Sequence, residues 1–371
     1  MNQPKTWTHT AYAQQLVFGA DSVDRLGEMV KSIGLRRVMV VTTEGRWASE
    51  AGERVRRALG RAAASVFDGV RSHVPADIVQ AAVAQARDDG VDGIVSFGGG
   101  SCADAAKAVA FFAEQAEGTP GTSHVDRPVL PHVSVTTTYS GAELTPFFGM
   151  TDPVSRRKTG AGGPTSAPVL AVYDPVLTLD LPAHISAETG MNALAHAVEA
   201  AYSPRRTPEA GAIALEAARR IGAALPSVVD DPGDLAARTA MFSGAALAGR
   251  CLMNASMGVH HGLAQLVGAR CGIAHGAANA MLLCHAVAFN ASAADDEVRA
   301  IGDALGDGDD PIGAIDRFRE RLGLPSGLTA LGVTEADLDV VAGMAMASYP
   351  VQTNVRPVTE DDARMILAAA M

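Results

Sequence analysis

The sequence predicts an α/β first half followed by an all-α second half. Short apolar runs alternate with helical patterns in the first half, whereas nearly every segment after residue 178 is an Ala- and Leu-rich helix broken by Gly, Pro and Asp. Strands that alternate with helices predict parallel βαβ units, with helices on both faces of the sheet. We therefore expect two domains, residues 1–178 and 179–371.

The individual elements follow from apolar runs that end in turn residues. These runs predict strands within 36–45, 91–101 and 127–141, and two more near 146–151 and 168–174. Amphipathic spacing predicts helices over 77–90, with Gly90 as the C-cap, and over 103–116. In the second half, "LGDGDDPIG" (305–313) predicts a solvated turn between helices.

Composition excludes several classes of protein. The chain has 371 residues, of which 48% are hydrophobic and 19% charged, as in a compact globular protein. Its net charge of −11 argues against a nucleic-acid partner, because phosphate binding needs a basic face. No uncharged apolar run reaches the roughly 18 residues of a membrane span, and no signal peptide is recognisable. The four cysteines form no CxxC pair, so we expect reduced thiols in a cytoplasmic protein.

A glycine-rich turn indicates a nucleotide site. In "FGGGSCADAAK" (97–107), three glycines end a predicted strand just before a helix. Glycine lets a backbone approach a ligand closely, and the N-terminus of the following helix favours phosphate. The alternative is an ordinary turn. The candidate cofactor-binding residues are Gly98, Gly99, Gly100, Ser101 and Asp104.

A second polar loop, "TTTYSGAELT" (136–145), follows the next predicted strand. Ligands of open α/β sheets bind at the carboxyl ends of the strands, so this loop and the glycine turn are expected to converge. The alternative is local turn chemistry, in which Thr and Ser bond the backbone. The candidate cofactor-binding residues here are Thr137, Thr138, Ser140 and Thr145.

"VVTTEGR" (40–46) lies where the adenosine ribose of a dinucleotide would be recognised. Thr43 and Glu44 follow the predicted strand, and a carboxylate there favours NAD. Arg46 could instead bind the 2′-phosphate of NADP. The sequence leaves NADH and NADPH open.

Histidines of the second half indicate a second site. "TGMNALAHAVEA" (189–200) places Asn192 and His196 on one helix face, with Glu199 one turn further. His261 and His275 come from two later segments within "GVHHGLAQLVGARCGIAHG" (258–276). Three imidazoles with one amide or carboxylate oxygen suit Fe²⁺ or Zn²⁺. The alternative is histidines that fill a core.

Several motifs together resemble one family. "FGGGSCADAAKAVA", "TTTYSGAELTPFFGMTD", "RRKTG", "TGMNALAHAVEAAYSP", "MGVHHGLAQLVGARCGIAHG" and the tail "NVRPVTEDDAR" are similar, in order, to the iron-containing alcohol dehydrogenase superfamily. Within it they look most like maleylacetate reductases. The resemblance implies a dehydroquinate synthase-like fold, with a dinucleotide-binding domain, a helical domain that carries the metal site, and an active site between them. It also implies hydride transfer with NADH or NADPH, a homodimer and a role in the catabolism of aromatic compounds.

The same resemblance assigns metal-ligand positions and exposes departures from the family. The ligand positions fall on Asn192, His196, His261 and His275. Asn192 replaces the Asp of the metal-dependent branch, a change that is also typical of maleylacetate reductases. Gln265 replaces a histidine that is a proton-relay candidate, and "HGAAN", with Asn279, replaces the "HAETH" usual in maleylacetate reductases. His260 is expected on a different helix face from His261.

The expected reaction is hydride transfer to a C=C or C=O bond conjugated to the carboxylate of a small unsaturated or oxo acid. A histidine, or the hydroxyl of Tyr139, would supply the proton. Lys158 would bind the carboxylate or the cofactor, with Arg156 or Arg157 as alternatives. The catalytic candidates are His196, His261, His275, Tyr139 and Lys158. Two other hypotheses remain: a metal-dependent alcohol dehydrogenase for a small alcohol or aldehyde, and an altered member with a binding or biosynthetic role.

Overall fold

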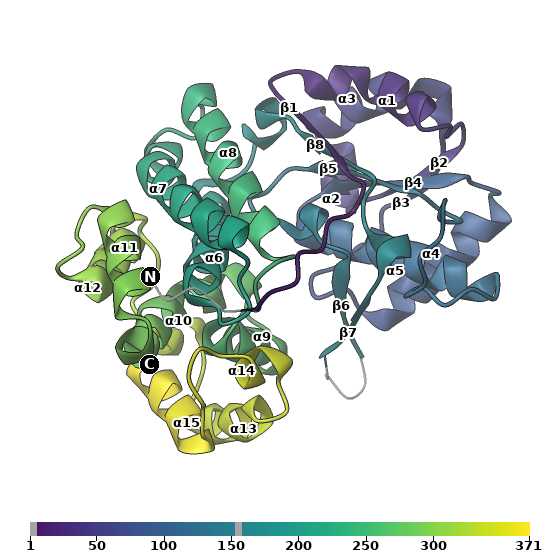
Figure 1. Ribbon diagram of the computed structural model, residues 1–371. Coiled ribbons are helices and arrows are strands. Elements are labelled where there is room, and N and C mark those ends of the chain that lie inside the picture. The colour runs from purple at the N-terminus through teal and green to yellow at the C-terminus, as the bar shows by residue number, and fades with distance from the viewer. Residues whose placement is uncertain (1–5, 153–157) are drawn as a thin grey trace. The chain divides into compact units, whose positions relative to one another are not determined.

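The computed structural model describes residues 6–152 and 158–371, which form two compact units (Figure 1). The α/β unit comprises residues 11–138 and 142–180, and the helical unit comprises residues 6–10, 139–141 and 181–371. Two short segments of the first half, residues 6–10 and 139–141, thus belong with the helices. They belong there because Thr10 donates its N–H to Asn254 Oδ1 at 2.7 Å, and the Tyr139 hydroxyl contacts Arg238.

The α/β unit is built on one parallel sheet of six strands, in the order β1-β8-β5-β4-β2-β3. The strands are β1 (Gln15–Phe18), β2 (Val38–Val41), β3 (Ala63–Phe67), β4 (Gly93–Gly98), β5 (His132–Thr136) and β8 (Leu170–Tyr173). Four of them lie within predicted segments, and the parallel α/β class is confirmed. The short strands β1 and β3 were not predicted.

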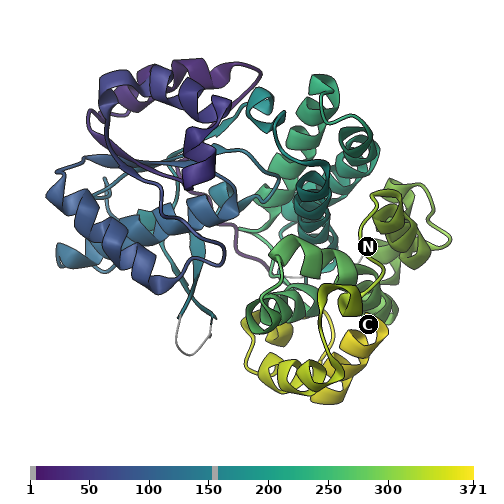
Figure 2. The ribbon, with the colours of Figure 1, turned by 180° about the vertical axis from the view of Figure 1, so that it is seen from behind.

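Helices cover both faces of this sheet, as Figure 2 shows from behind. Val38 and Val40 of β2 pack on the face covered by α1 (Leu26–Ser32) and α3 (Glu50–Leu59). Met39 and Val41 pack on the face covered by α4 (Ala76–Asp88) and α5 (Gly100–Ala116). The strand is buried on both sides, so its sequence is continuously apolar rather than alternating. The predicted helices α4 and α5 are confirmed, and Gly90, just beyond α4, has a φ of +59°.

Two segments differ from the predicted elements. The strand expected near 146–151 is β6 (Phe147–Thr151), which pairs antiparallel with the unpredicted β7 (Lys158–Gly162) in a separate two-stranded sheet. The strand predicted within 36–45 is β2, which ends at Val41 because Thr43 caps the short helix α2 (Glu44–Ala48). Thr43 Oγ1 accepts the N–H of Arg46 at 3.2 Å, which ends the extended backbone.

The helical unit confirms the all-α second half. Its α-helices are α6 (Ala183–Tyr202), α7 (Pro208–Asp230), α8 (Leu235–Cys251), α9 (Val259–Cys271), α10 (His275–Asn290), α11 (Asp295–Leu305), α12 (Pro311–Arg321), α13 (Glu335–Ala345), α14 (Tyr349–Gln352) and α15 (Glu360–Ala369). Every residue of α6 from Gly190 to Tyr202 is buried, because α7, α8, α10 and α11 pack around it. The predicted turn at 305–313 separates α11 from α12.

Within the described parts of the chain, no helix combines the length and apolarity needed to cross a lipid bilayer. All four cysteines are unbridged thiols, and three of them are buried.

Candidate active site

The turn between β4 and α5 requires glycine on steric grounds. Gly98 has a φ of +145°, and a Cβ there would lie 2.5 Å from the Sγ of Cys102. A Cβ on Gly99 would lie 2.9 Å from Cγ2 of Thr138. Gly99 offers no side chain to cap α5, so the first N–H groups at the positive end of this 17-residue helix face outward. This arrangement suits a phosphate ligand.

The two polar loops of the α/β unit meet at this turn. Gly98 at the end of β4 pairs with Thr136 at the end of β5, and the N–H of Thr137 donates to the Gly98 carbonyl at 3.0 Å. Thr138 contacts Gly99 directly. The turn therefore brings Thr137 and Thr138 together with the glycines, as the sequence predicted for strand ends at one edge of a sheet.

The segment after β2 reaches the same edge. Glu44 opens α2, and Arg46 forms an ion pair with Asp180, with 2.7 Å between Nη1 and Oδ2. Asp180 lies beyond β8, so the pair joins the ends of two strands that β4 and β5 separate. Burial raises the pKa of the Cys102 thiol to about 12, and the Arg46 guanidinium opposes that rise. Arg46 thus lies near the glycine turn with a carboxylate partner already in place.

Two other cofactor candidates serve the scaffold. Asp104 accepts from Lys107 Nζ at 2.7 Å and from the N–H of Gly149 at 3.2 Å. Lys107 is fully buried and also donates to the carbonyls of Ala142 and Phe147 and, at 3.4 Å, to Thr145 Oγ1. Asp104 and Thr145 therefore help to fasten the 142–149 segment to α5. Ser101 lies half-buried in the first turn of that helix.

The helical unit brings the predicted imidazoles together. His196 on α6 and His261 on α9 stack with ring centroids 4.7 Å apart and an interplanar angle of 15°. His275, the first residue of α10, lies with its ring centroid 6.1 Å from that of His261. His196 and His261 are buried, whereas His275 is half-buried. Three helices, α6, α9 and α10, thus supply one histidine cluster.

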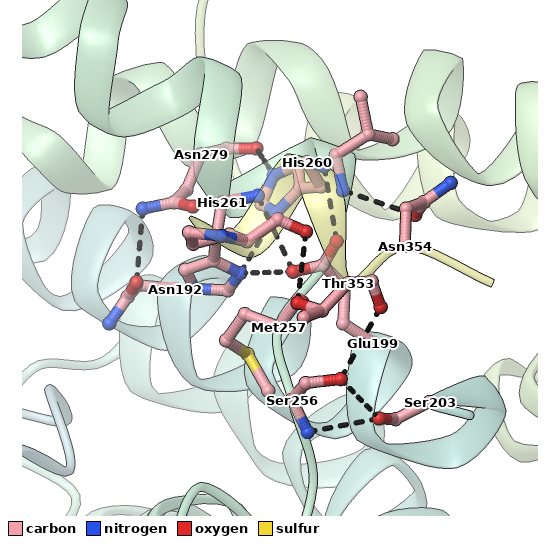
Figure 3. Close-up of polar contacts among 12 residues, drawn as sticks. Asn192, Glu199, Ser203, Ser256, Met257, His260, His261, Asn279, Thr353 and Asn354 are labelled. Carbon is pink, nitrogen blue, oxygen red and sulfur yellow. Dashed lines mark hydrogen bonds and ion pairs between the residues drawn. The ribbon is translucent and has the colours of Figure 1, made fainter. Parts of the chain in front are cut away.

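A buried carboxylate, that of Glu199, contacts His261 of this cluster (Figure 3). Glu199, three residues after His196 on α6, lies 2.6 Å from Nδ1 of His261 through Oε2. Its two oxygens also accept the backbone N–H groups of His260, at 3.1 Å, and of His261, at 3.4 Å. Asn354 Oδ1 accepts the N–H of Val259 at 3.1 Å. Glu199 and Asn354 together cap α9 from other parts of the chain.

Amides connect the cluster to α10 and to the 139–141 segment. Nε2 of His260 lies 2.9 Å from the carbonyl of Asn279, and the His260 and His261 rings are nearly perpendicular. Asn279 Nδ2 donates to Asn192 Oδ1 at 3.0 Å, and Asn192 Nδ2 donates to the Ser140 carbonyl at 3.4 Å. Ser140 therefore lies in the helical unit, where its backbone orients an amide of the histidine cluster.

Tyr139 occupies the core of the helical unit. Its hydroxyl lies 3.3 Å from Nη1 of Arg238, and its ring meets Phe242 edge-on with centroids 5.4 Å apart. Arg238 is fully buried and also donates to the carbonyls of Pro232 and Leu181. The phenol is thus a neighbour of a buried cation.

Burial controls the charge of the cluster. It lowers the pKa of His196 well below its ordinary value, and the neighbouring histidines lower it further. It lowers the pKa of His260 to about 4, with His261 adding to the shift. Burial raises the pKa of Glu199, against the opposing effects of His260 and of the backbone N–H groups that the carboxylate accepts. His196 and His260 are therefore uncharged near neutral pH.

The donor set tests the fit of a divalent metal. Atoms of Glu199, His260 and His261 lie within 4.8 Å of one another and could hold an ion, but they already form hydrogen bonds among themselves. The ligand set implied by the family resemblance contains no carboxylate, and its amide oxygen, on Asn192, accepts from Asn279. With these hydrogen bonds in place, the residues fit a site without metal better than a site whose ligands offset the double positive charge of a divalent ion.

Some predicted residues lie at the limit of the described structure. Arg156 and Arg157 fall outside the described residues. The backbone of Lys158 opens β7 opposite Thr151, and its side chain is also outside the described part. Gln265 is half-buried on α9, one turn after His261.

The sequence did not predict roles for several residues of the site and of the scaffold around it. Glu199 carried a signal, because it lies three residues after His196 on the same helix face. Asn354, Arg238 and Asp180 carried none, because each meets its partner only through the tertiary fold.

Fold and site define a class: a dinucleotide-binding α/β unit with a helical unit that carries a histidine cluster, as in dehydrogenases and reductases. Comparison with known families makes this class specific. Residues 13–175 match the family described as iron-containing alcohol dehydrogenase, and residues 186–371 match its C-terminal part. The chain belongs to the iron-containing alcohol dehydrogenase family.

Relatives and solved structures agree with this assignment. The chain is 36% identical over 357 residues to a maleylacetate reductase of Burkholderia cepacia, covering 96% of this chain and 95% of the relative. It is 34% identical to maleylacetate reductase 1 of Rhodococcus opacus, covering 97% and 95%. The crystal structure of maleylacetate reductase from Agrobacterium tumefaciens superposes with a TM-score of 0.86 at 33% identity, covering 99% and 98%. A 1,3-propanediol oxidoreductase superposes with a TM-score of 0.92 at 28% identity, covering 98% and 100%. The chain is thus an NAD(P)H-dependent reductase of this family.

Proposed function

We propose that the chain reduces maleylacetate or a closely related unsaturated oxo acid, with NADH or NADPH as the hydride donor. The observation that carries this proposal is the stacked pair of His196 and His261, backed by Glu199, in a chain similar over nearly its full length to maleylacetate reductases. The Gly98–Gly100 turn would hold the cofactor phosphates, and the histidine cluster would bind the reacting part of the substrate.

The reaction needs one hydride and one proton. A nicotinamide cofactor held at the Gly98–Gly100 turn would supply a hydride to one carbon of the C=C bond, and the electron pair of that bond would move onto the conjugated carbonyl as an enolate. The neighbouring carbon then takes a proton, which leaves a saturated oxo acid and NAD(P)⁺. A proton donor close to the reacting carbon is therefore the main chemical demand on the protein.

His261 is the proposed proton donor. Its Nδ1 faces the Glu199 carboxylate, which stabilises a positive charge on the ring. His196 stays uncharged through burial, and no hydrogen-bond partner faces its Nδ1 among the described residues, so this atom can bind the substrate. His275 is the alternative donor because it is half-buried. The buried Tyr139 hydroxyl, next to Arg238, suits this role less.

The finer features of the enzyme are proposals as well. We propose that Lys158 binds a substrate carboxylate or the cofactor, since an ammonium suits either anion. Asn192, His196, His261 and His275 remain the proposed ligands of any bound Fe²⁺ or Zn²⁺.

The family resemblance supports a homodimer, and the names of the relatives support a role in aromatic-compound catabolism. The four unbridged cysteines agree with a cytoplasmic enzyme. Sedimentation of the purified protein tests the dimer.

The deciding experiment is a reductase assay that follows the nicotinamide absorbance with maleylacetate, a panel of simple aldehydes, and either cofactor, with and without EDTA. We expect reduction of maleylacetate that EDTA does not abolish. Removal of the proton donor in His261→Ala should lower kcat by about 10²–10⁴-fold, whereas His184→Ala, an exposed histidine on the same helix α6 as His196, serves as the control. Turnover of aldehydes alone, and only with added metal, would contradict the proposal.

A further inference from the structure

We propose that Glu199 is a positioning residue: it holds His261 as the Nδ1–H tautomer, so that Nε2 is the atom that exchanges a proton with the substrate. The inference rests on the proposed function and adds which ring nitrogen of His261 exchanges the proton. A carboxylate only accepts hydrogen bonds, so a ring nitrogen 2.6 Å from it carries the proton.

Both oxygens of Glu199 accept hydrogen bonds from the first turn of α9. Oε1 accepts the N–H of His260, and Oε2 accepts the N–H of His261 as well as the ring contact. These N–H groups belong to the first turn of α9, where the helix dipole also stabilises a negative charge. The carboxyl group is nearly fully buried, so it keeps these partners rather than exchanging them for water.

His260 supplies an independent argument for the same tautomer. Its Nε2 lies 2.9 Å from the carbonyl of Asn279, which accepts, so the proton of His260 is on Nε2 and its Nδ1 carries a lone pair. That Nδ1 lies 3.3 Å from Nδ1 of His261. A proton on Nδ1 of His261 therefore meets two acceptors, whereas a lone pair there would face another lone pair and a carboxylate.

The backbone at the start of α9 leaves room for this arrangement. A Cβ on Gly258 would lie 2.8 Å from Oε1 of Glu199 and 2.5 Å from Oδ1 of Asn354. The helix is therefore capped by side chains of α6 and of the 353–356 segment instead of by its own N-cap residue (Figure 3). Asn354 Oδ1 bonds the N–H of Val259, whereas Glu199 bonds the ring of His261, so a variant of Asn354 tests the capping function separately from the positioning function.

The test compares Glu199→Gln, Glu199→Asp and Asn354→Ala with the wild-type enzyme. Nitrogen NMR of the histidine rings reports the tautomer, with the His261 signals identified by their loss in His261→Ala. In Glu199→Gln an NH2 group replaces one of the two accepting oxygens. When the amide oxygen accepts the backbone N–H groups, the NH2 group faces Nδ1 of His261 and donates to it. We therefore expect the ring proton to move toward Nε2 and kcat to fall about 10- to 100-fold with little change in KM. Glu199→Asp keeps the carboxylate and should restore part of kcat.

Asn354→Ala should lower the unfolding temperature but leave the tautomer and kcat as in the wild type. The inference is overturned if the neutral ring of wild-type His261 carries its single proton on Nε2 instead of Nδ1, if Glu199→Gln keeps full kcat, or if Asn354→Ala causes the same loss of kcat. A wild-type enzyme that reduces none of the substrates would overturn the proposed function instead. The NMR spectra alone would then decide whether Glu199 holds the tautomer.

Discussion

At the scale of single residues, the charge partner of a side chain decides what it can bind. Arg46 follows β2, where a dinucleotide ribose would lie, yet Asp180 already neutralises its guanidinium. The family resemblance places Asn192 at the position of a metal-binding carboxylate, and its oxygen accepts from Asn279. In each case a neighbouring side chain is bonded to the group that would bind the ligand, and this neighbour changes the affinity of the group for that ligand.

The Arg46–Asp180 pair should favour NADH over NADPH. Asp180→Asn removes a negative charge and frees the guanidinium for a 2′-phosphate, so NADPH should bind about three- to tenfold more tightly. The effect is modest because Asp180 is half exposed and solvent screens it. Fluorescence titration with NADH and NADPH measures it. Asp88→Asn, an exposed acid at the end of α4, removes the same charge and should change neither affinity. An equal gain for both cofactors would count against this role.

Asn192→Asp should create a stronger metal site. The substitution adds the anionic oxygen that the cluster of His196, His261 and His275 lacks, while Asn279 Nδ2 can still donate to the second oxygen. We expect Zn²⁺ affinity to rise on the order of tenfold or more. Elemental analysis after equilibration with Zn²⁺ measures the change. Equal zinc content in the wild type and the variant would show that charge at this position does not limit binding.

At the scale of elements, the end of a strand and the start of a helix form the Gly98–Gly100 turn, which we propose as the phosphate site. β4 stops at Gly98 and α5 begins at Gly100, so the chain reverses direction within a single connecting residue, Gly99. Lys107 and Asp104 on the next turns of α5 then fasten the 142–149 segment. One helix therefore carries both the proposed phosphate site and the anchor for the loop after β5.

Gly99→Ala should weaken cofactor binding. The new methyl group would lie 2.9 Å from Cγ2 of Thr138, and it would occupy the space in which a phosphate approaches the helix. We expect NADH affinity to fall about tenfold, as for the loss of one or two charge-assisted hydrogen bonds. Isothermal titration measures it. Gly343→Ala on α13, where the nearest contact would be 3.5 Å, is the matched control. Unchanged NADH binding would argue against the turn as the phosphate site.

At the scale of the whole molecule, buried titratable groups couple stability to pH. His132 on β5 is fully buried beside Ser96, with 2.7 Å between Nε2 and the hydroxyl oxygen. Burial lowers its pKa from 6.5 to about 3, and Lys107 adds to the shift. In the folded state the ring therefore stays neutral at pH values where an unfolded chain would protonate it.

The sign of this coupling follows from the lowered pKa. Below pH 6.5 the unfolded state binds one more proton than the folded state, so the free energy of unfolding falls as the pH drops, down to about pH 3. One proton corresponds to about 1.4 kcal/mol per pH unit. Urea unfolding between about pH 7 and pH 5 should therefore show a shallower pH dependence for His132→Gln than for the wild type. Parallel curves would mean that His132 does not titrate on unfolding.

The overall fold and the members of the histidine cluster could be predicted from the sequence because both depend on local patterns. Continuous apolar runs such as Val38–Val41 indicate strands that are buried on both faces, and glycines at a strand end indicate a close approach of the backbone. The short strand β1 escaped prediction because three of its four residues are exposed, so the strand carries little pattern of burial. The strand β7 escaped because its Gly-rich sequence is stabilised by pairing with β6 rather than by its own propensity.

The sequence by itself determined which residue types are available: glycines before a helix, three histidines on separate segments, and a neutral amide where a carboxylate would bind metal. Only the tertiary structure decided their chemistry. Hydrogen bonds and burial join residues that are far apart in the chain, such as Glu199 with His261, Asn192 with Asn279 and Arg46 with Asp180. A side chain acquires its tautomer, charge and affinity from those partners, and no local pattern specifies them.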